Sequence, residues 1–198
     1  MKTDIISVND KTALSKIAAI IRKGGIVVYP TETSYGIGAD WTNPHAVRKI
    51  FRVKGRSGEK RLPVIAPSLA VMEKYAMINE ETKELAEAFM PGPLTLVVPL
   101  RNRKGTVAFR ISSHRFAHEL AKKINGPITA TSANRAGEPS IYDGREAIDL
   151  FADMVDAIVD GGRLRKRKAS TIYDTTKHFV LRKGPISEKA IAWILGKR

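Results

Sequence analysis

Basic and hydroxyl side chains gather in loops of this chain that glycine or proline residues bound. Lys54 and Arg56 flank one glycine, and two cations at this spacing can clasp one phosphate group, the arginine with two hydrogen bonds and the lysine as a point charge. Ser132 and Asn134 lie two residues apart, so in an extended segment their side chains point the same way. Each pair alone is weak evidence, because a solvated basic face and ordinary turn chemistry explain them equally well.

Three other stretches of this kind follow short apolar runs. Residues 29–38 offer hydroxyls and a flexible backbone, which suit a small polar ligand and a mere connecting loop equally. Arg110 ends an apolar strand that also carries Thr106, and it serves either as a carboxylate clamp or as half of a surface ion pair. Ser170 and Arg182 lie on strands near the C-terminus. Strand ends are where α/β folds place their ligands.

Several familiar kinds of active site are absent from the sequence. The chain has no cysteine, which excludes disulfides, thiolate metal sites and cysteine nucleophiles. No phosphate-loop motif occurs, and Gly36-Ile-Gly38 lacks the rest of the dinucleotide fingerprint. His114 and His118 have the spacing of metal ligands on a helix but no obvious third ligand, so the metal ligands stay unknown. The histidines and acids do not suggest a hydrolytic triad either.

The charge of the chain points to anionic partners. Its 34 lysines and arginines outnumber its 20 acids, which gives a net charge of +14. Such a field attracts nucleic acids, nucleotides and phosphate substrates. Basic residues concentrate in segments 48–61 and 163–168. For an isolated run of this kind, a solvated surface is the simpler explanation.

Apolar strands and amphipathic helices alternate along all 198 residues. Asn43, Asn79 and Ser187 are good helix N-caps, and residues 94–99 and 106–110 have the pattern of neighbouring strands. The alternation predicts one α/β (α+β) domain over residues 1–198, a twisted mixed sheet flanked by helices. No apolar run is long enough for a membrane span, and the N-terminus lacks a secretory pattern, so we expect a cytoplasmic protein.

Taken in order, these motifs resemble the YrdC family of threonylcarbamoyl-AMP synthases. The matching stretches keep a consistent spacing over nearly the whole chain, so the ordered set is highly specific although its parts are weak. They are YPTETSYGIGAD at 29–40, FRVKGR at 51–56, PGPLTLVVPL at 91–100, VAFR at 107–110, ITATSANRAGEPS at 128–140, STIYD at 170–174 and LRKGPIS at 181–187.

The resemblance implies a YrdC-like fold with a large electropositive cavity and a set of site residues. Lys54 and Arg56 match catalytic positions. The positions that match threonine-binding residues are Thr33, Arg110, Ala130 through its backbone, and Ser170. Those that match residues around ATP are Arg56, Lys60, Thr106, Ser132, Asn134, Ser140 and Arg182. The chain departs from the family at Ile65, where some relatives have a threonine-contacting histidine, and in its basic run 163–168.

The resemblance also implies the reaction and the partners. L-threonine, bicarbonate and ATP, with Mg²⁺ as the cofactor, would yield threonylcarbamoyl-AMP and pyrophosphate. The product would pass to a tRNA threonylcarbamoyl transferase complex that modifies the adenosine next to the anticodon, with direct contact to tRNA or double-stranded RNA as a further expectation and no membrane partner. All reactants are anionic, so preorganised cations such as Lys54 and Arg56 suit the chemistry, and no covalent nucleophile is required.

Two alternatives stay open at this point. The first keeps the fold and makes carbamoyl-adenylate, as the YrdC-like module of hydrogenase-maturation carbamoyltransferases does, although those modules normally sit in much longer chains. The second is a non-catalytic RNA-binding protein that uses its basic surface, with an affinity that falls steeply as salt rises.

Overall fold

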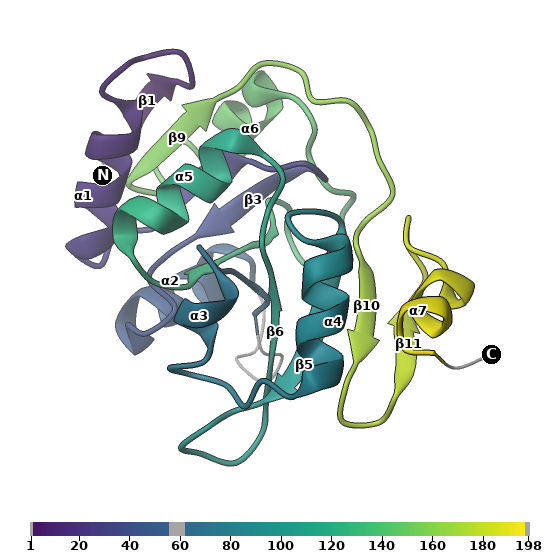
Figure 1. Cartoon of the computed structure of the whole chain (residues 1–198). Coiled ribbons are helices and arrows are strands. Elements are labelled where there is room, and N and C mark those ends of the chain that lie inside the picture. The colour runs from purple at the N-terminus through teal and green to yellow at the C-terminus, as the bar shows by residue number, and fades with distance from the viewer. Residues whose placement is uncertain (1, 56–61, 197–198) are drawn as a thin grey trace.

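The computed structural model describes residues 2–55 and 62–196, in which helices and strands alternate (Figure 1). The strands are β1 (Asp4–Ser7), β2 (Val27–Pro30), β3 (Tyr35–Gly38), β4 (Val64–Ile65), β5 (Leu94–Pro99), β6 (Thr106–Arg110), β7 (Ile128–Thr129), β8 (Thr131–Ser132), β9 (Ala157–Asp160), β10 (Thr171–Asp174) and β11 (Phe179–Arg182). The helices are α1 (Ala13–Arg22), α2 (Pro44–Val53), α3 (Leu69–Met72), α4 (Glu80–Phe89), α5 (Arg115–Ile124), α6 (Gly144–Phe151) and α7 (Glu188–Ile194).

The strands form two sheets, each with parallel and antiparallel pairs. The first has the order β1-β9-β2-β3-β8, and the second has the order β11-β10-β5-β6-β4-β7. In the first, β2 and β9 are parallel, whereas β2 and β3 are antiparallel. In the second, β5 is parallel to β10 and antiparallel to β6. The mixed α/β class expected from the sequence is confirmed, and its strands are divided between two sheets.

The first sheet is buried on both faces. Val27 and Tyr29 of β2 pack into a core with α1 and α5. Val28, between them, points to the opposite face and packs with α2 and α6. Successive side chains of a strand point to opposite faces, so a sheet covered on both sides needs strands that are apolar at every position. This explains the unbroken apolar run that precedes the hydroxyl-rich loop.

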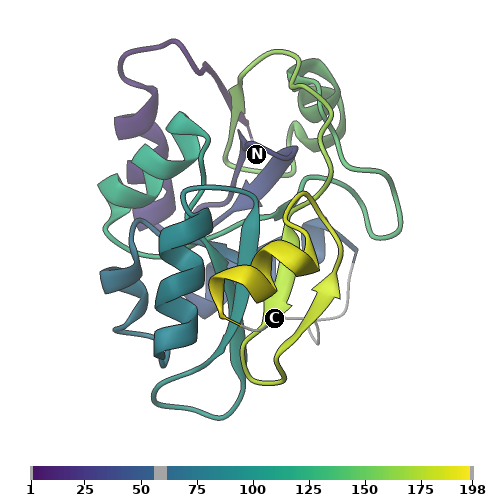
Figure 2. The same ribbon diagram turned by 45° about the vertical axis from the view of Figure 1, so that its right-hand side comes forward.

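The central strands β5 and β6 of the second sheet have their large apolar core on one face. Leu96 of β5 and Phe109 of β6 pack against α3, α4 and α7. Figure 2 shows α4 and α7 side by side over this sheet. On the other face, Thr95, Ala108 and Arg110 border a cavity. The alternation of polar or small residues with large apolar ones along β5 and β6 therefore separates a core face from a cavity face.

The two sheets meet where the chain passes from one to the other. β7 belongs to the second sheet and β8 to the first, and only Ala130 separates them. The Ala130 N–H donates to the Pro63 carbonyl at 2.8 Å, while Thr129 N–H donates to the Ala39 carbonyl at 2.9 Å. These hydrogen bonds fix the crossing segment between the two sheets, directly beside the cavity.

The predicted helix caps are present. The Asn43 side chain accepts hydrogen bonds from the N–H groups of His45 and Ala46, and Pro44 occupies the first helical position of α2. Asn79 and Ser187 cap α4 and α7 in the same way. Within residues 2–55 and 62–196, the helices are too short and too polar for any of them to cross a bilayer.

Gly184 lets the segment after β11 approach the backbone just before β10. A Cβ atom at this position would lie 2.3 Å from the Thr171 nitrogen and 2.5 Å from the Ala169 carbonyl oxygen. Both neighbours are backbone atoms and cannot turn aside as a side chain can. Glycine is therefore required here because a Cβ atom has no space. The backbone φ of Gly184 is not in the left-handed region, so the conformational freedom of glycine is not the reason.

We expect Gly184→Ala to lower the free energy of unfolding by about 1–3 kcal/mol, as overpacking commonly does. Urea denaturation followed by circular dichroism measures this change. Gly126→Ala is the matched control, because its added Cβ would lie 3.9 Å from its nearest neighbour, the Ile124 side chain. Equal stability of the two variants would contradict the steric argument.

Candidate active site

A cavity of about 440 Å³ lies between the two sheets. Thr31, Thr33 to Gly36 and β8 border it from the first sheet, and strands β5, β6, β10 and β11 border it from the second. Most of the described residues that the sequence nominated share this one cavity. They are Thr33, Arg110, Ala130, Ser132, Ser140, Ser170 and Arg182.

Hydroxyl groups line the cavity in two hydrogen-bonded sets. The Thr31 hydroxyl donates to the Ser34 carbonyl at 2.7 Å and lies 3.1 Å from the Thr33 hydroxyl. On the opposite wall, the hydroxyls of Thr95 and Ser170 are 2.7 Å apart. These bonds fix the orientation of side chains that offer both a donor and an acceptor to a ligand.

Arg182 is held against Ser170. Its Nε donates to the Ser170 carbonyl at 3.0 Å, and one terminal nitrogen donates to the Ser170 hydroxyl at 3.1 Å. Burial lowers the pKa of Arg182 from its usual value, and the positive charge of Arg110 lowers it further. Two guanidinium groups thus lie close enough to repel each other, which is unfavourable unless an anion occupies the space near them.

Arg110 is paired with an acid that the sequence reasoning did not single out. Its Nε lies 2.9 Å from a carboxylate oxygen of Glu32, and the two side chains are only 7% and 6% exposed. Among the described residues these two atoms have no partner with hydrogen-bond geometry, so the contact is electrostatic. Glu32 thus fixes one edge of the guanidinium and compensates its charge.

Further groups surround the Glu32 carboxylate. The buried Ser112 hydroxyl donates to the other carboxylate oxygen of Glu32. The backbone N–H of His114 donates to the hydroxyl oxygen of Ser112 at 3.2 Å. Burial lowers the pKa of the His114 imidazole, an effect that the charge of Glu32 opposes. Burial also raises the pKa of Tyr29, which lies within the electrostatic reach of both Arg110 and Glu32.

Lys54 supports the segment that carries Ser132 and Asn134. This lysine is only 3% exposed, and its ammonium donates to the Ser132 carbonyl at 2.5 Å and to the carbonyl and side-chain oxygens of Asn134 at 2.9 Å each. The Ser132 hydroxyl donates to the same Asn134 side-chain oxygen at 2.6 Å. The two short motifs therefore form one bonded unit, in which Lys54 orients the segment at the cavity wall.

Some nominated residues lie elsewhere. Thr106 borders a second cavity, of about 590 Å³, together with Trp41 and Arg103. Arg56 and Lys60 fall outside the described residues, so their predicted roles stay predictions. Ile65 is fully buried in the α1–α5 core beside Arg110, its partner in the strand register.

The sequence reasoning missed two charged residues of this region. Glu32 lies within the motif at 29–40, but its role depends on Arg110, 78 positions later, and no local pattern signals that contact. Arg167 also borders the cavity. The basic run 163–168 could have suggested a role for this arginine, although the run does not reveal which of its members borders the cavity.

The donors around the cavity suit a metal ion that arrives with a substrate. Magnesium prefers oxygen ligands, and nucleotide sites commonly leave most of its coordination to phosphates and water. The described residues that line the cavity offer hydroxyls and backbone carbonyls but no carboxylate. Elsewhere in residues 2–55 and 62–196, no group of three or more histidine, aspartate or glutamate side chains is placed to hold a metal.

Comparisons with known proteins agree with this arrangement. A family model named for Sua5, YciO and YrdC, with the description "Telomere recombination", matches residues 19–184. Threonylcarbamoyl-AMP synthase from Pyrococcus abyssi (strain GE5 / Orsay) is 36% identical over 209 residues, covering 98% of this chain and 62% of the relative.

Solved structures give the same result. P. abyssi Sua5 complexed with L-threonine matches with a TM-score of 0.91 at 35% identity, covering 98% of this chain and 62% of that one. E. coli YciO matches with a TM-score of 0.84 at 22% identity, covering 96% and 98% of the two chains, a likeness that concerns the fold alone. The chain spans about three fifths of the length of the P. abyssi proteins that it matches.

We expect Glu32→Gln to lower the free energy of unfolding by about 3–5 kcal/mol, because it leaves the Arg110 charge buried without its counter-ion. Arg110→Met should restore part of that loss when it is combined with Glu32→Gln. Urea denaturation of the two single variants and the double variant gives the coupling energy. Strictly additive losses would show that the two residues do not depend on each other.

We expect Lys54→Met to cost about 1–3 kcal/mol, because it leaves buried carbonyl oxygens without a donor. Amide hydrogen exchange should also become faster in residues 132–138, the segment that the ammonium holds. Lys49→Met is the control, since Lys49 lies at the exposed surface and its ammonium donates to the Gly24 carbonyl at 2.9 Å, far from this segment in the sequence. If both variants exchange alike in this segment, Lys54 has no special part in ordering it.

Proposed function

The chain belongs to the Sua5, YciO and YrdC family, and from this premise we propose that it is a threonylcarbamoyl-AMP synthase. It converts L-threonine, bicarbonate and ATP into threonylcarbamoyl-AMP and pyrophosphate, with the cytoplasm as its place of action. The observation that carries the proposal is the cavity in which Thr33, Arg110, Ala130 and Ser170 meet. A relative 35% identical to this chain has been solved in complex with L-threonine.

The cavity wall around Arg110 suits an amino acid. Since Glu32 occupies Nε of Arg110, the terminal nitrogens of the guanidinium are the donors that remain for a carboxylate, which arginine binds with two parallel hydrogen bonds. The hydroxyls of Thr33 and Ser170 can bond the polar groups of threonine. The carbonyl of Ala130, at the crossing between the sheets, is a suitable acceptor for its amine.

The reaction requires two bond-forming steps. The neutral amine of threonine and bicarbonate form N-carboxythreonine with loss of water. A carboxylate oxygen of this carbamate then attacks the α-phosphorus of ATP, the bond from that phosphorus to the bridging oxygen breaks, and pyrophosphate leaves with the electron pair. No covalent enzyme intermediate is needed, so positioning and charge stabilisation make up the catalysis.

The remaining nominated residues would serve the nucleotide. Arg182, Ser132 and Ser140 border the same cavity as the threonine set and can contact phosphate or ribose oxygens. Asn134 orients Ser132 through the bond between their side chains. Arg56 and Lys60 are assigned to ATP by the family motif alone, and so is Thr106, which borders the neighbouring cavity.

Within this proposal, Lys54 is a positioning residue and Mg²⁺ is bound as part of the substrate. The Lys54 ammonium is directed at carbonyl oxygens of residues 132 and 134, so it shapes the site from behind the wall. Mg²⁺ would neutralise phosphate charge when it is bound with ATP, and the hydroxyls of Ser132 and Ser140, which border the cavity, would be available to it as oxygen ligands.

We also propose a hand-off of the product to a tRNA threonylcarbamoyl transferase complex. The chemistry supports this, since a mixed anhydride of a carbamate and a phosphate is reactive and needs prompt transfer. The net charge of +14 further favours contact with tRNA or double-stranded RNA. The exposed side chains of Arg48 and Lys49 on α2 belong to such a basic surface.

The first test is pyrophosphate release by the purified protein with ATP and Mg²⁺, with threonine and bicarbonate each supplied or omitted. We expect release only when both are present, and a loss of about 10²–10³-fold in rate for Arg110→Gln, which removes a preorganised charge. Lys16→Gln is the control, because Lys16 lies on α1 and its ion pair with Asp10 is at the surface.

Other outcomes would replace this function. Release that is indifferent to threonine but requires carbamoyl phosphate would favour carbamoyl-adenylate synthesis. Absence of any nucleotide turnover together with salt-sensitive RNA binding would favour a non-catalytic RNA-binding protein.

A further inference from the structure

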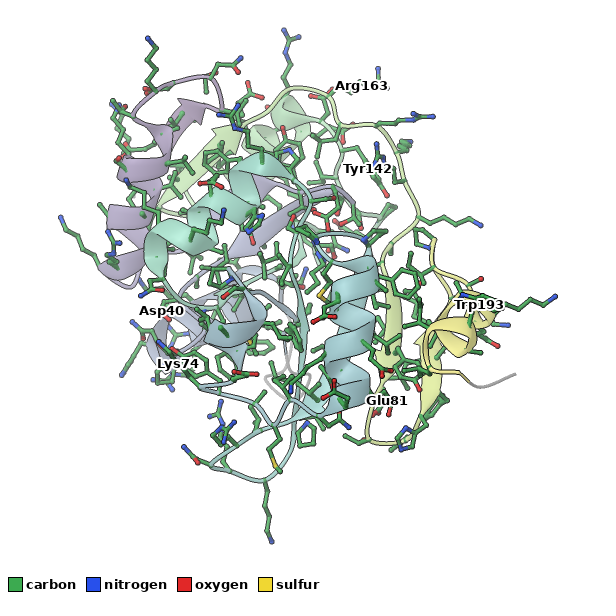
Figure 3. The ribbon with its side chains drawn as sticks, in the orientation of Figure 1. Asp40, Lys74, Glu81, Tyr142, Arg163 and Trp193 are labelled. Atoms are coloured by element: carbon green, nitrogen blue, oxygen red, sulfur yellow. The ribbon has the colours of Figure 1, made fainter. Side chains whose placement is uncertain are left out.

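The basic segment 163–168 is fastened to the rest of the molecule at both ends. At its start, the Leu164 N–H donates to the Tyr142 carbonyl at 2.7 Å, and Arg163 forms a β-bridge with Asp143. Figure 3 shows Tyr142 and Arg163 on the same side of the molecule. Just after its end, the Thr171 N–H donates to the Pro93 carbonyl at 2.9 Å. The segment is thus a strap that runs from β9 to β10 along the cavity.

The members of this strap differ in where they lie. Arg167 borders the cavity together with Ser140, Tyr142 and Arg182. The Lys166 ammonium lies over the Tyr142 ring, 5.8 Å from its centre. Arg165 and Arg167 are both exposed, but Arg165 does not border this cavity. Of these two arginines, the fold therefore places only Arg167 at the rim of the cavity.

The charges around the cavity do not balance. Glu32 compensates Arg110. Arg182 bonds the neutral groups of Ser170 instead of an acid, and its pKa is lowered by burial and by Arg110. No carboxylate is found among the described lining residues that accompany Arg167 and Arg182. Cations without an acid on the same wall form a site for an anion of more than one charge.

We propose that Arg167, with Arg182 and Ser140, forms a subsite for a polyphosphate: the β- and γ-phosphates of the nucleotide before the reaction and pyrophosphate after it. The inference extends the proposed function, on which it rests. The family resemblance nominated Arg182 and Ser140 for ATP, whereas Arg167 comes from the strap in which this chain departs from its relatives. Arginine suits this role because its planar fork binds phosphate oxygens in pairs.

This arrangement fits the charge movement of the reaction. As the bond from the α-phosphorus to the bridging oxygen breaks, negative charge builds up on the departing pyrophosphate. A cation beside that group stabilises the transition state more than the ground state, which raises the rate of the chemical step. The same contact retains pyrophosphate after the reaction, so product inhibition is expected to depend on Arg167.

The test compares Arg167→Gln with Arg165→Gln, which removes the same charge from a neighbouring, outward position. Titration calorimetry with inorganic pyrophosphate and Mg²⁺ at fixed ionic strength measures the subsite directly. We expect Arg167→Gln to weaken pyrophosphate binding about tenfold or more, the usual effect of losing a charged hydrogen bond. We expect KM for ATP to rise in parallel, KM for threonine to stay the same, and Arg165→Gln to bind like the parent.

A third variant and a second ligand make the outcome decisive. Arg167→Lys keeps the charge but loses the fork, and binding intermediate between parent and Arg167→Gln would support the paired contact. Equal weakening of pyrophosphate binding in Arg165→Gln would overturn the subsite, because the overall positive potential of the protein would then explain the binding. Unchanged pyrophosphate binding with weaker tRNA binding in Arg167→Gln would overturn it in favour of an RNA-docking strap.

Failure of this inference can be told apart from failure of the proposed function. If the parent binds pyrophosphate through Arg167 but makes no adenylate, the polyphosphate subsite stands and the reaction is wrong. If the parent makes threonylcarbamoyl-AMP and Arg167→Gln matches it in pyrophosphate affinity and in KM for ATP, the reaction stands and the subsite is wrong.

Discussion

The buried ion pair between Arg110 and Glu32 joins the two sheets of the molecule. Arg110 ends β6 of the second sheet, and Glu32 lies in the loop between β2 and β3 of the first. Neither charge is favourable in a buried position without the other, so the loop and the strand must be placed together. Thr33 beside Glu32 and Ser170 on the side of the second sheet thus border one common cavity.

Hydrogen bonds behind and beside the cavity wall complete the site. Lys54 holds the segment of Ser132 and Asn134 from behind, and Thr95 holds Ser170 from the side. Hydrogen bonds that hold the lining residues in place matter where catalysis depends on positioning, since a small displacement of a donor weakens its effect on the transition state. The arrangement places oriented donors around a space that suits ligands with carboxylate or phosphate groups.

The local features of this fold were predictable, and the long-range ones were not. The caps at Asn43 and Asn79, and the strands at 94–99 and 106–110, follow from patterns within a few residues, and the structure contains them. The division into two sheets depends on the crossing at Ala130, which no periodicity reveals. The partner of Arg110 and the position of Arg167 beside the cavity likewise depend on contacts between distant segments. The ordered motifs named residues that the structure brings to one cavity, because a motif names residues without requiring the topology, and the roles of these residues stay predictions.

The crossing at Ala130 has a consequence for the thermodynamics of the whole protein. A molecule bound at this seam touches one sheet through Thr33 and the other through Arg110, so its binding energy adds to the cohesion between the sheets. A ligand that binds only the folded chain raises the unfolding free energy by RT ln(1 + [L]/Kd). The resistance of this fold to heat therefore depends on the concentration of any ligand that occupies this cavity, and so does the time that the folded chain survives.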